Sequence, residues 1–513
     1  MERTTTRRIA VLLALVALFG ATTQTPPGHA RTWHILADGS GDAPTIQAGI
    51  DSSAHYDTVL VAPGTYFESI GFDGKKIVVG SYFASTQDTS YISQTVIDAG
   101  PLFASCVGFT DAEERQSILT GLTLAHGHGT WNGYLWGGGI FCLGASPTLS
   151  HLIIRDCMFA GADEFGGGIA VLGGAPLIDN VEIRRCAATE GGGLQCEGPN
   201  AHPIVLNTRI TGCEANIGPA VSVYGGATVR LEQVVLDGNV AHSSGDWSRA
   251  ISTSSGGEAT IIRSTLTGND TGALAVSYNG RARVIDSILW GDGGAEIVMF
   301  YASDSGLVVS HCDIEGGQAG IATPDSAWVA WLEGNLDVDP LFTDPDAGDY
   351  SLQIASECID AGTAHFEWLG SVLLDLDPNA YCGAAPEIGA WEYCPDAAGV
   401  AGDAGTGSGP SRAAGSGLRL DLRAQNPGRG STMLELHARS GAGREEIVIG
   451  IFDASGRCIR RLEVPAFGVG TYRVTWDGCD AAARRMPSGC YLARTLARGA
   501  RSGTAARIVL MRD

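Results

Sequence analysis

Three segments decide the fold: LIIRDC at 152–157, VEIRRC at 181–186 and TRITGC at 208–213. Each ends in cysteine, and their ends lie 29 and 27 residues apart. The same element recurs on both sides, as LTLAHG ending at Gly127, VVLDGN at Asn239, STLTGN at Asn269, SILWGD at Asp292 and CDIEGG at Gly317, with successive ends 23 to 30 residues apart. This interval is too short for a βαβ unit with its helix, but it suits one coil of a parallel β-helix with three short strands.

A run of three glycines recurs in step with this element. It stands at 137–139, 166–168 and 191–193, and each run opens an apolar strand. The repeats show no 3.6-residue helical period, and the 72 glycines of the chain suit many short strands joined by tight turns. Each coil buries its inward side chains only when neighbours stack on it at the strand spacing of about 4.8 Å. We therefore predict an all-β fold, a right-handed parallel β-helix.

Stacking places equivalent positions of successive coils in columns. The position six residues before each element end is polar from the second coil onward, which predicts a turn column whose side chains bond along the stack or meet solvent: His151, Asn180, Asn207, Gln233, Arg263, Asp286 and His311. A second column holds Cys157, Cys186, Cys213, Asn239 and Asn269. Adjacent rungs lie within disulfide reach, although stacked buried thiols need no bond, so both states remain open.

The N-terminus has the pattern of an export signal. Arg3, Arg7 and Arg8 precede the apolar run 9–19, and Gly28-His29-Ala30 follows as a small-residue cleavage site. No later stretch is long and apolar enough to span a bilayer, so we predict no transmembrane segment and a secreted or cell-surface location.

Composition divides the remaining chain. We predict a signal peptide at 1–30, the β-helix at 31–395, a Gly/Ala/Ser-rich linker at 396–416 and a β-sandwich at 417–513. Within the β-helix, the apolar spacing of Ile46 and Ile50 predicts a short amphipathic helix that covers the open N-terminal end of the stack.

Charge separates the two large domains. Residues 31–396 carry 13 Lys and Arg against 45 Asp and Glu, a net charge of −32, whereas residues 397–513 carry 17 Arg against 10 Asp and Glu, a net charge of +7. Nucleic-acid binding draws its free energy from phosphate neutralised by Lys and Arg, so an acidic body excludes nucleic acid as a partner. Neutral ligands, or ligands bridged by cations, fit better.

Two stretches carry a resemblance to a known family. IQAGID (46–51) with DTVLVAPGTYFESI (57–70) and TVIDAG (95–100) resembles the opening of secreted right-handed β-helix repeat proteins of the pectin-lyase-like superfamily. The segment 339–362 with PEIGAWE (386–392) resembles the closing region of that group. The resemblance covers about residues 33–394 and implies the β-helix fold; the superfamily includes polysaccharide lyases and glycoside hydrolases as well as members without activity.

The tail resembles a different family. IVIGIFDASGRCIRRLEV (447–464), GTYRVTWDGCD (470–480) and SGCYLARTL (488–496) are similar to the FlgD-like immunoglobulin-type domains that end many exported proteins. Alternating strands separated by Ser-Gly and Asp-Gly turns agree with a small all-β sandwich. The resemblance implies that this domain engages secretion or surface-attachment machinery.

The turns that follow the second column hold the candidate site, because they should lie along one edge of the stack. Aromatic rings can stack on pyranose faces, and carboxylates accept hydrogen bonds from sugar hydroxyls. We expect the ligand-binding residues to be Trp131, Tyr134, Trp136, Glu164, Glu214, Asp246 and Trp247. Asp163 and Glu190 are the pair we would test as catalytic carboxylates, since glycoside hydrolysis needs two carboxyl groups about 5 to 10 Å apart. The competing interpretation is that these rings cover the flank of the stack and the acids maintain solubility.

Pectate-lyase chemistry would need carboxylates for Ca²⁺ together with an Arg base. Arg155 and Arg184 share a column beside Arg185, Asp156 and Asp179, but the column continues as Thr211 and Asp237, so a structural Arg–carboxylate ladder fits better.

Two functional hypotheses remain. The first is a carbohydrate-binding β-helix without catalysis, whose partner is a polysaccharide or cell-surface glycan. The second is a polysaccharide lyase or glycoside hydrolase that acts on a neutral or Ca²⁺-bridged glycan. Neither requires a cofactor, Ca²⁺ is an optional ligand, and no metal-binding residues are assigned.

Overall fold

The computed structural model describes residues 30–157, 164–243, 245–301, 304–323, 327–377, 380–381 and 383–393, and in the C-terminal part 419–424, 428–429, 432–440, 447–452, 458–464, 470–480, 484–486, 489–495 and 505–511. The first 29 residues of the predicted signal peptide and the whole predicted linker, 396–416, lie outside the described residues.

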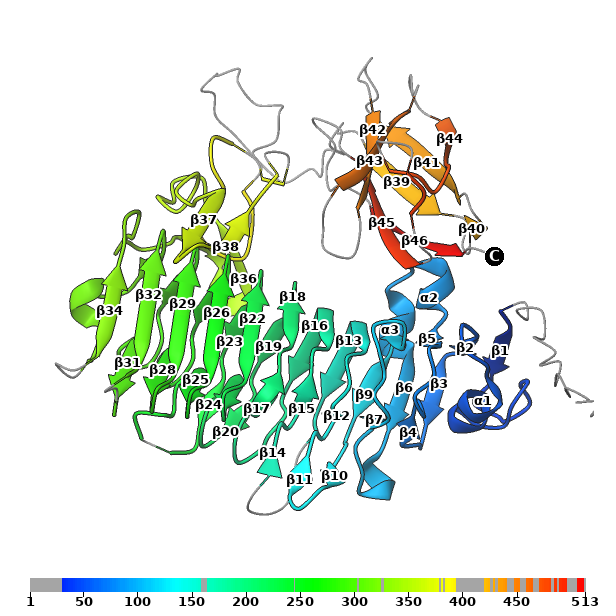
Figure 1. Cartoon of the computed structure of the whole chain (residues 1–513), viewed down its shortest axis with the longest axis horizontal. Coiled ribbons are helices and arrows are strands. Elements are labelled where there is room, and N and C mark those ends of the chain that lie inside the picture. Colours follow the sequence, from blue (N-terminus) through cyan, green and yellow to red (C-terminus); the bar gives the residue numbers. More distant parts are fainter. Residues whose placement is uncertain are drawn as a thin grey trace, which may run out of the picture.

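Most of the chain forms a parallel β-solenoid of about 10 turns (Figure 1). Its walls are a bent sheet of 20 strands, which we name sheet A, and a nine-stranded sheet, which we name sheet B. Each coil adds two successive strands to sheet A and one to sheet B, and we call the layer so formed a rung. This confirms the fold class predicted from the repeat, an all-β parallel solenoid followed by smaller antiparallel sheets.

The first column of sheet A contains β1 (Thr32–Ile35), β2 (Thr58–Val61), β5 (Val78–Ser81), β8 (Ile118–Thr120), β13 (Thr148–Arg155), β16 (Leu177–Arg184), β18 (Ile204–Leu206), β22 (Thr228–Glu232), β26 (Glu258–Ile262), β29 (Arg281–Ile285), β32 (Gly306–Ser310) and β34 (Trp328–Trp331). The second column contains β3 (Gly64–Tyr66), β6 (Thr95–Asp98), β9 (Thr123–Ala125), the second halves of β13 and β16, β19 (Arg209–Thr211), β23 (Val235–Asp237), β27 (Thr265–Thr267), β30 (Ile288–Trp290) and β33 (Asp313–Ile314).

Sheet B contains β4 (Ile70–Gly71), β7 (Val107–Phe109), β12 (Ile140–Leu143), β15 (Ile169–Gly174), β17 (Leu194–Ala201), β21 (Val221–Tyr224), β25 (Ile251–Ser254), β28 (Leu274–Ser277) and β31 (Ile297–Phe300). Shorter strands form in the turns that lead into sheet B: β10 (Thr130–Trp131), β11 (Leu135–Trp136), β14 (Glu164–Phe165), β20 (Glu214–Ala215) and β24 (Val240–Ala241).

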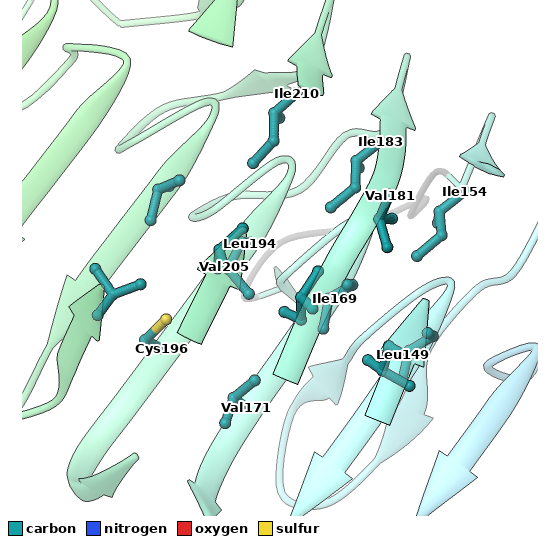
Figure 2. Packing of buried hydrophobic residues seen from close by; sticks show 14 of the residues in the cluster. Leu149, Ile154, Ile169, Val171, Val181, Ile183, Leu194, Cys196, Val205 and Ile210 are labelled. Atoms are coloured by element: carbon teal, nitrogen blue, oxygen red, sulfur yellow. The ribbon is translucent and has the colours of Figure 1, made fainter. Parts of the chain in front are cut away.

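Inward side chains of the two sheets meet in one continuous apolar core. Figure 2 shows Ile154, Ile183 and Ile210 on successive rungs of sheet A, with Ile169 and Leu194 of sheet B nearby. All five side chains are at most 1% exposed. Because alternate residues of a strand face opposite sides, the same strands must present their remaining side chains outward.

The bend between the two columns of sheet A coincides with the predicted turn column. His151, Asn180, Asn207, Gln233, Arg263, Asp286 and His311 all have a φ between 47° and 55°. This left-handed conformation costs free energy for a non-glycine residue, but Asn, Asp and His tolerate it best. The polar character of the column is thus explained by the backbone conformation that the bend requires.

The second predicted column forms an internal ladder. Asn239 Oδ1 accepts the backbone N–H of Cys213 at 3.0 Å, and Asn269 Oδ1 accepts the backbone N–H of Asn239 at 3.1 Å. The amide of Asn239 also donates to Asn269 Oδ1 at 2.9 Å, and Asp292 continues the ladder. Cys157, Cys186 and Cys213 are buried free thiols, so the alternative without disulfides holds in this structure.

The glycine runs bring the backbone of neighbouring rungs close together. Gly166 has a φ of +71°, whereas Gly168 is needed for space. A Cβ at Gly168 would lie 2.5 Å from the carbonyl oxygen of Gly193 and 2.6 Å from Ile183 Cγ2. These glycines therefore set the tight corner that leads into sheet B.

Helix α1 (Ile46–Ser52) lies at the N-terminal end of the stack, where the sequence predicts a cap (Figure 1). Thr45 Oγ1 accepts the N–H of Ala48 at 3.1 Å, and Ile46 and Ile50 join the solenoid core. The other helical segments are short: α2 (Phe83–Thr86), α3 (Ser90–Gln94), η1 (Gly100–Leu102), η2 (Gln318–Gly320) and η3 (Pro345–Ala347).

After β34, the chain folds back across the outer face of sheet A. This return segment contains the antiparallel hairpins β35 (Phe342–Asp344) with β36 (Asp349–Leu352) and β37 (His365–Trp368) with β38 (Ser371–Asp375). Tyr350 Oη donates to Asp237 Oδ2 at 3.2 Å, and the N–H of Thr363 donates to Asp286 Oδ1 at 2.9 Å. The segment thereby covers the outer face of sheet A on its C-terminal rungs, where Ile262, Ile285 and Val308 pack with Phe366 and Leu374.

The C-terminal region has two small sheets. One contains β39 (Arg419–Ala424), β41 (Thr432–Ser440) and β44 (Gly470–Trp476), all antiparallel. The other contains β40 (Gly428–Arg429), β46 (Ala505–Met511), β45 (Gly489–Thr495), β42 (Ile447–Phe452) and β43 (Cys458–Val464). Trp476, Ile449 and Ile508 are fully buried in the core of this unit, consistent with a small immunoglobulin-like domain.

Candidate functional site

The turns that lead into sheet B form continuous columns, as the candidate site requires. Trp136 pairs with Phe165 in the strand register, Phe165 pairs with Glu190, and Glu190 pairs with Ile217. These four side chains belong to four successive rungs, so residues up to 81 positions apart in the chain lie in one row. The row borders the outer face of sheet B.

An aromatic cluster occupies the first two rungs of this row, beside β12 and β15. The loop that carries it is closed by an antiparallel pair in which Trp131 lies opposite Leu135. Trp136 is only 5% exposed and packs with Phe165 over Phe141 and Ala170. Trp131 is 73% exposed and Tyr134 is 49% exposed. Trp131 and Tyr134 therefore offer free ring surface, whereas Trp136 holds the loop against the sheet.

Glu164 lies beside this cluster but faces the protein. It is 3% exposed, and its Oε1 has no hydrogen-bond partner among the described residues. Burial raises the pKa of this carboxyl. Glu164 and Trp136 are therefore both buried beneath the exposed rings, and neither side chain is available to a ligand at the surface.

Glu190 occupies the third rung of the row. It lies between Phe165 and Ile217, and burial, with a smaller contribution from the charge of Glu197, raises its pKa to about 7. Glu197 is half-buried on β17, and burial raises its pKa as well, while a hydrogen bond from Gln195 opposes that shift. Gln195 Nε2 donates to Glu197 Oε2 at 3.0 Å.

Gln195 and Glu197 are site residues that sequence reasoning missed. They alternate with Leu194 and Cys196, which point into the core, so the LQCE pattern at 194–197 already indicates that both face outward. Their register partners on the neighbouring rungs are Ala170 and Ser222 for Gln195, and Leu172 and Tyr224 for Glu197. We name Glu190, Gln195 and Glu197 the polar rung.

The remaining predicted residues lie apart from the polar rung. Glu214 pairs with His242, with its Oε2 3.0 Å from the ring Nε2. Trp247 is 40% exposed and lies 5.9 Å, centroid to centroid, from Phe300 of the last rung of sheet B, and Asp246 is exposed beside it. Asp163, the proposed partner of Glu190, lies outside the described residues.

The arginine column of sheet A forms ion pairs with its neighbours. Asp156 accepts bonds from Arg155 at 2.6 Å and from Arg185 at 2.8 Å, and Arg184 pairs with Glu182 at 2.9 Å. Further along, Arg209 pairs with Asp237 at 2.6 Å. These pairs support the structural ladder that the sequence favours.

Two absences are relevant within the described parts of the chain. No group of three or more His, Cys, Asp or Glu side chains there is arranged to hold a metal ion. No helix there combines the length and apolar character needed to cross a membrane.

Comparison with known proteins adds one family match. Residues 425–498 match the FlgD Ig-like domain. Among curated proteins, none matches this chain significantly. One solved structure similar to it is a tailspike protein, gp49 of the Acinetobacter baumannii bacteriophage Fri1, described as a capsular polysaccharide depolymerase. The two are 10% identical, the match covers 93% of this chain and 83% of that chain, and the TM-score is 0.25.

Proposed function

We propose that this chain is an exported protein that binds a polysaccharide on the outer face of sheet B. One observation carries the proposal: the exposed rings of Trp131 and Tyr134 lie two rungs from the polar rung along the same parallel stack. Aromatic rings combine apolar faces with low conformational entropy, which suits stacking on sugars. The half-buried carboxylates of Glu190 and Glu197 supply acceptors for hydroxyl groups.

The solenoid geometry suits a polymer. Rungs repeat at about 4.8 Å, so a face spanning several rungs presents a regular series of contacts along one direction. The net charge of −32 over residues 31–396 disfavours polyanions unless cations bridge them. The proposed ligand is therefore a neutral glycan or one bridged by Ca²⁺.

Location and attachment are part of the same proposal. The charged and apolar N-terminal pattern supports export, and the likeness of the opening and closing motifs to pectin-lyase-like β-helix repeat proteins supports an extracellular role. The FlgD Ig-like region at 425–498 would then serve in secretion or surface attachment.

A glycan array probed with the full chain, with and without Ca²⁺, tests the proposal. We expect binding to carboxyl-free glycans in both conditions and to uronate-containing glycans only with Ca²⁺. The double variant Trp131→Ala/Tyr134→Ala should weaken binding about tenfold, equivalent to about 1.4 kcal/mol. Trp391→Ala, which removes a 52% exposed ring from the return segment, serves as the matched control. Absence of binding to every glycan, or equal loss in the control, would overturn the proposal.

A further inference from the structure

Opposite charges separate the return segment from the C-terminal domain that follows it. The return segment, residues 339–393, carries 11 Asp and Glu and no Lys or Arg. Residues 397–513 carry 17 Arg and no Lys against 10 Asp and Glu, a net charge of +7. Surfaces of opposite charge attract each other over about one Debye length, which is about 30 Å at 0.01 M salt. Charge therefore favours contact between these two parts of the chain.

Two arginines lie on the outward face of the five-stranded C-terminal sheet. Ile449 and Ile451 of β42 are buried in the core of the domain, so Gly450 between them faces outward. Gly450 pairs in the register with Arg461 of β43 and with Arg494 of β45, and directly paired residues share one face. Two strand spacings place these exposed arginines about 10 Å apart, with no side chain between them. We name Arg461, Gly450 and Arg494 the arginine row.

The return segment presents carboxylates at the end of β38. Asp375 is the last residue of this strand, and Asp377 follows two positions later. Both side chains are exposed, and Asp377 Oδ2 lies 3.6 Å from Arg461 Nη2. Figure 1 shows the return segment and the C-terminal domain on the same side of the solenoid. The ion pair therefore joins the arginine row to the return segment.

One exposed ion pair is too weak to keep two domains together, because solvent screens it and both side chains lose entropy. Two further effects add to it. The net charges of both parts act at once over the Debye length. Because one chain carries both surfaces, their local concentration is about millimolar, so even a weak contact is largely formed. The guanidinium group of arginine is weakly hydrated and can bind a carboxylate with two hydrogen bonds, which suits such a contact.

We propose that the arginine row is a docking surface for the acidic return segment of the same chain, and that salt releases it. The solenoid and the C-terminal domain have separate apolar cores, so their separation exposes neither core. An anionic partner of the arginine row must displace the return segment, so the two contacts exclude each other. This inference does not require that sheet B binds a glycan.

Small-angle X-ray scattering of the full chain in NaCl tests the proposal. Between about 0.01 M and 1 M salt the Debye length falls from about 30 Å to about 3 Å. We expect the radius of gyration to rise over this range, with a midpoint that marks release. Arg461→Asp and Asp377→Arg should each shift this midpoint to lower salt. The double variant exchanges the two charges and should return the midpoint toward that of the parent chain, since the pair is restored.

Arg473→Asp is the matched control. It makes the same change in net charge as Arg461→Asp, but Arg473 is exposed on the other sheet of the domain, between the inward residues Tyr472 and Val474. It should shift the midpoint less than Arg461→Asp does.

Three results would refute docking through the arginine row: a radius of gyration that salt does not change, an equal shift in the control, or no recovery in the double variant. A mass in light scattering that rises with protein concentration at low salt would show that the row binds a second copy, which refutes docking within one chain.

Discussion

The indole of Trp136 stacks on the ring of Phe165 from the next rung, with centroids 4.5 Å apart and planes inclined by 22°. Together they cover Phe141 and Ala170 on the outer face of sheet B. The stacked pair therefore anchors the loop that presents Trp131 and Tyr134.

Removing the buried ring should cost stability, whereas removing the exposed one should not. Trp136→Ala is expected to lower the free energy of unfolding by about 3 kcal/mol, because it leaves a cavity against Phe165. Trp131→Ala removes a ring that is 73% exposed, so it should change the free energy of unfolding by less than about 0.5 kcal/mol. Urea unfolding of both variants measures the difference, and equal losses would contradict the assigned roles.

The third glycine of each run should tolerate no side chain. Gly168→Ala is expected to destabilise the fold by about 1 to 3 kcal/mol, because the new Cβ would meet the Gly193 carbonyl and Ile183. Gly108 on β7 of the same sheet has no atom within 4 Å of the corresponding Cβ position. Gly108→Ala should therefore be neutral or slightly stabilising. Thermal unfolding of both variants measures the difference. If Gly168→Ala is equally neutral, the close approach of the rungs is not as described.

The asparagine ladder should be sensitive to loss of a single member. Asn239→Ala leaves the N–H of Cys213, the carbonyl of Ile210 and Asn269 Oδ1 each without one hydrogen bond, so we expect a loss of about 2 to 4 kcal/mol. Amide hydrogen exchange at Cys213 should accelerate, which localises the effect. Asn200→Ala, at an exposed position, is the control, and unchanged exchange at Cys213 would argue against the ladder.

The contact between the return segment and sheet A should weaken as pH rises. Burial raises the pKa of Asp286 to about 8 from an ordinary value of 3.8, and this carboxyl is fully buried. The unfolded chain releases the proton at lower pH than the folded chain does. The free energy of unfolding therefore falls between about pH 4 and pH 8, and low pH relieves this penalty.

Asp286→Asn removes the penalty and keeps a carbonyl oxygen to accept the N–H of Thr363. We expect this variant to be more stable than the parent by about 3 kcal/mol near pH 8, with the difference vanishing near pH 4. Asp73→Asn is the matched control, because Asp73 has a similar left-handed φ of 52° but is exposed. A stability difference that does not depend on pH would refute the assignment.

The repeat predicted the stack and its columns because equivalent positions recur at nearly constant intervals. The polar column from His151 to His311 and the ladder from Cys157 to Asn269 are both present in the structure. The site was predicted less completely. Glu190 lies in the expected row, but its neighbour on the surface is Glu197 and not Glu214, because Glu214 lies three positions earlier in its coil and pairs with His242.

The sequence by itself determined the architecture. The spacing of the repeats, the alternation of inward residues and the glycine runs are local features of the chain. Stacking follows from them because each coil must bury its apolar side chains against its neighbours. Only the tertiary structure decided which outward side chains share a surface and which are covered. Trp131 and Trp136 are five residues apart in one loop, yet one is exposed and the other buried. That difference arises because Phe165, from the next rung, covers only Trp136, and such a contact between rungs depends on the packing of turns whose lengths vary from coil to coil.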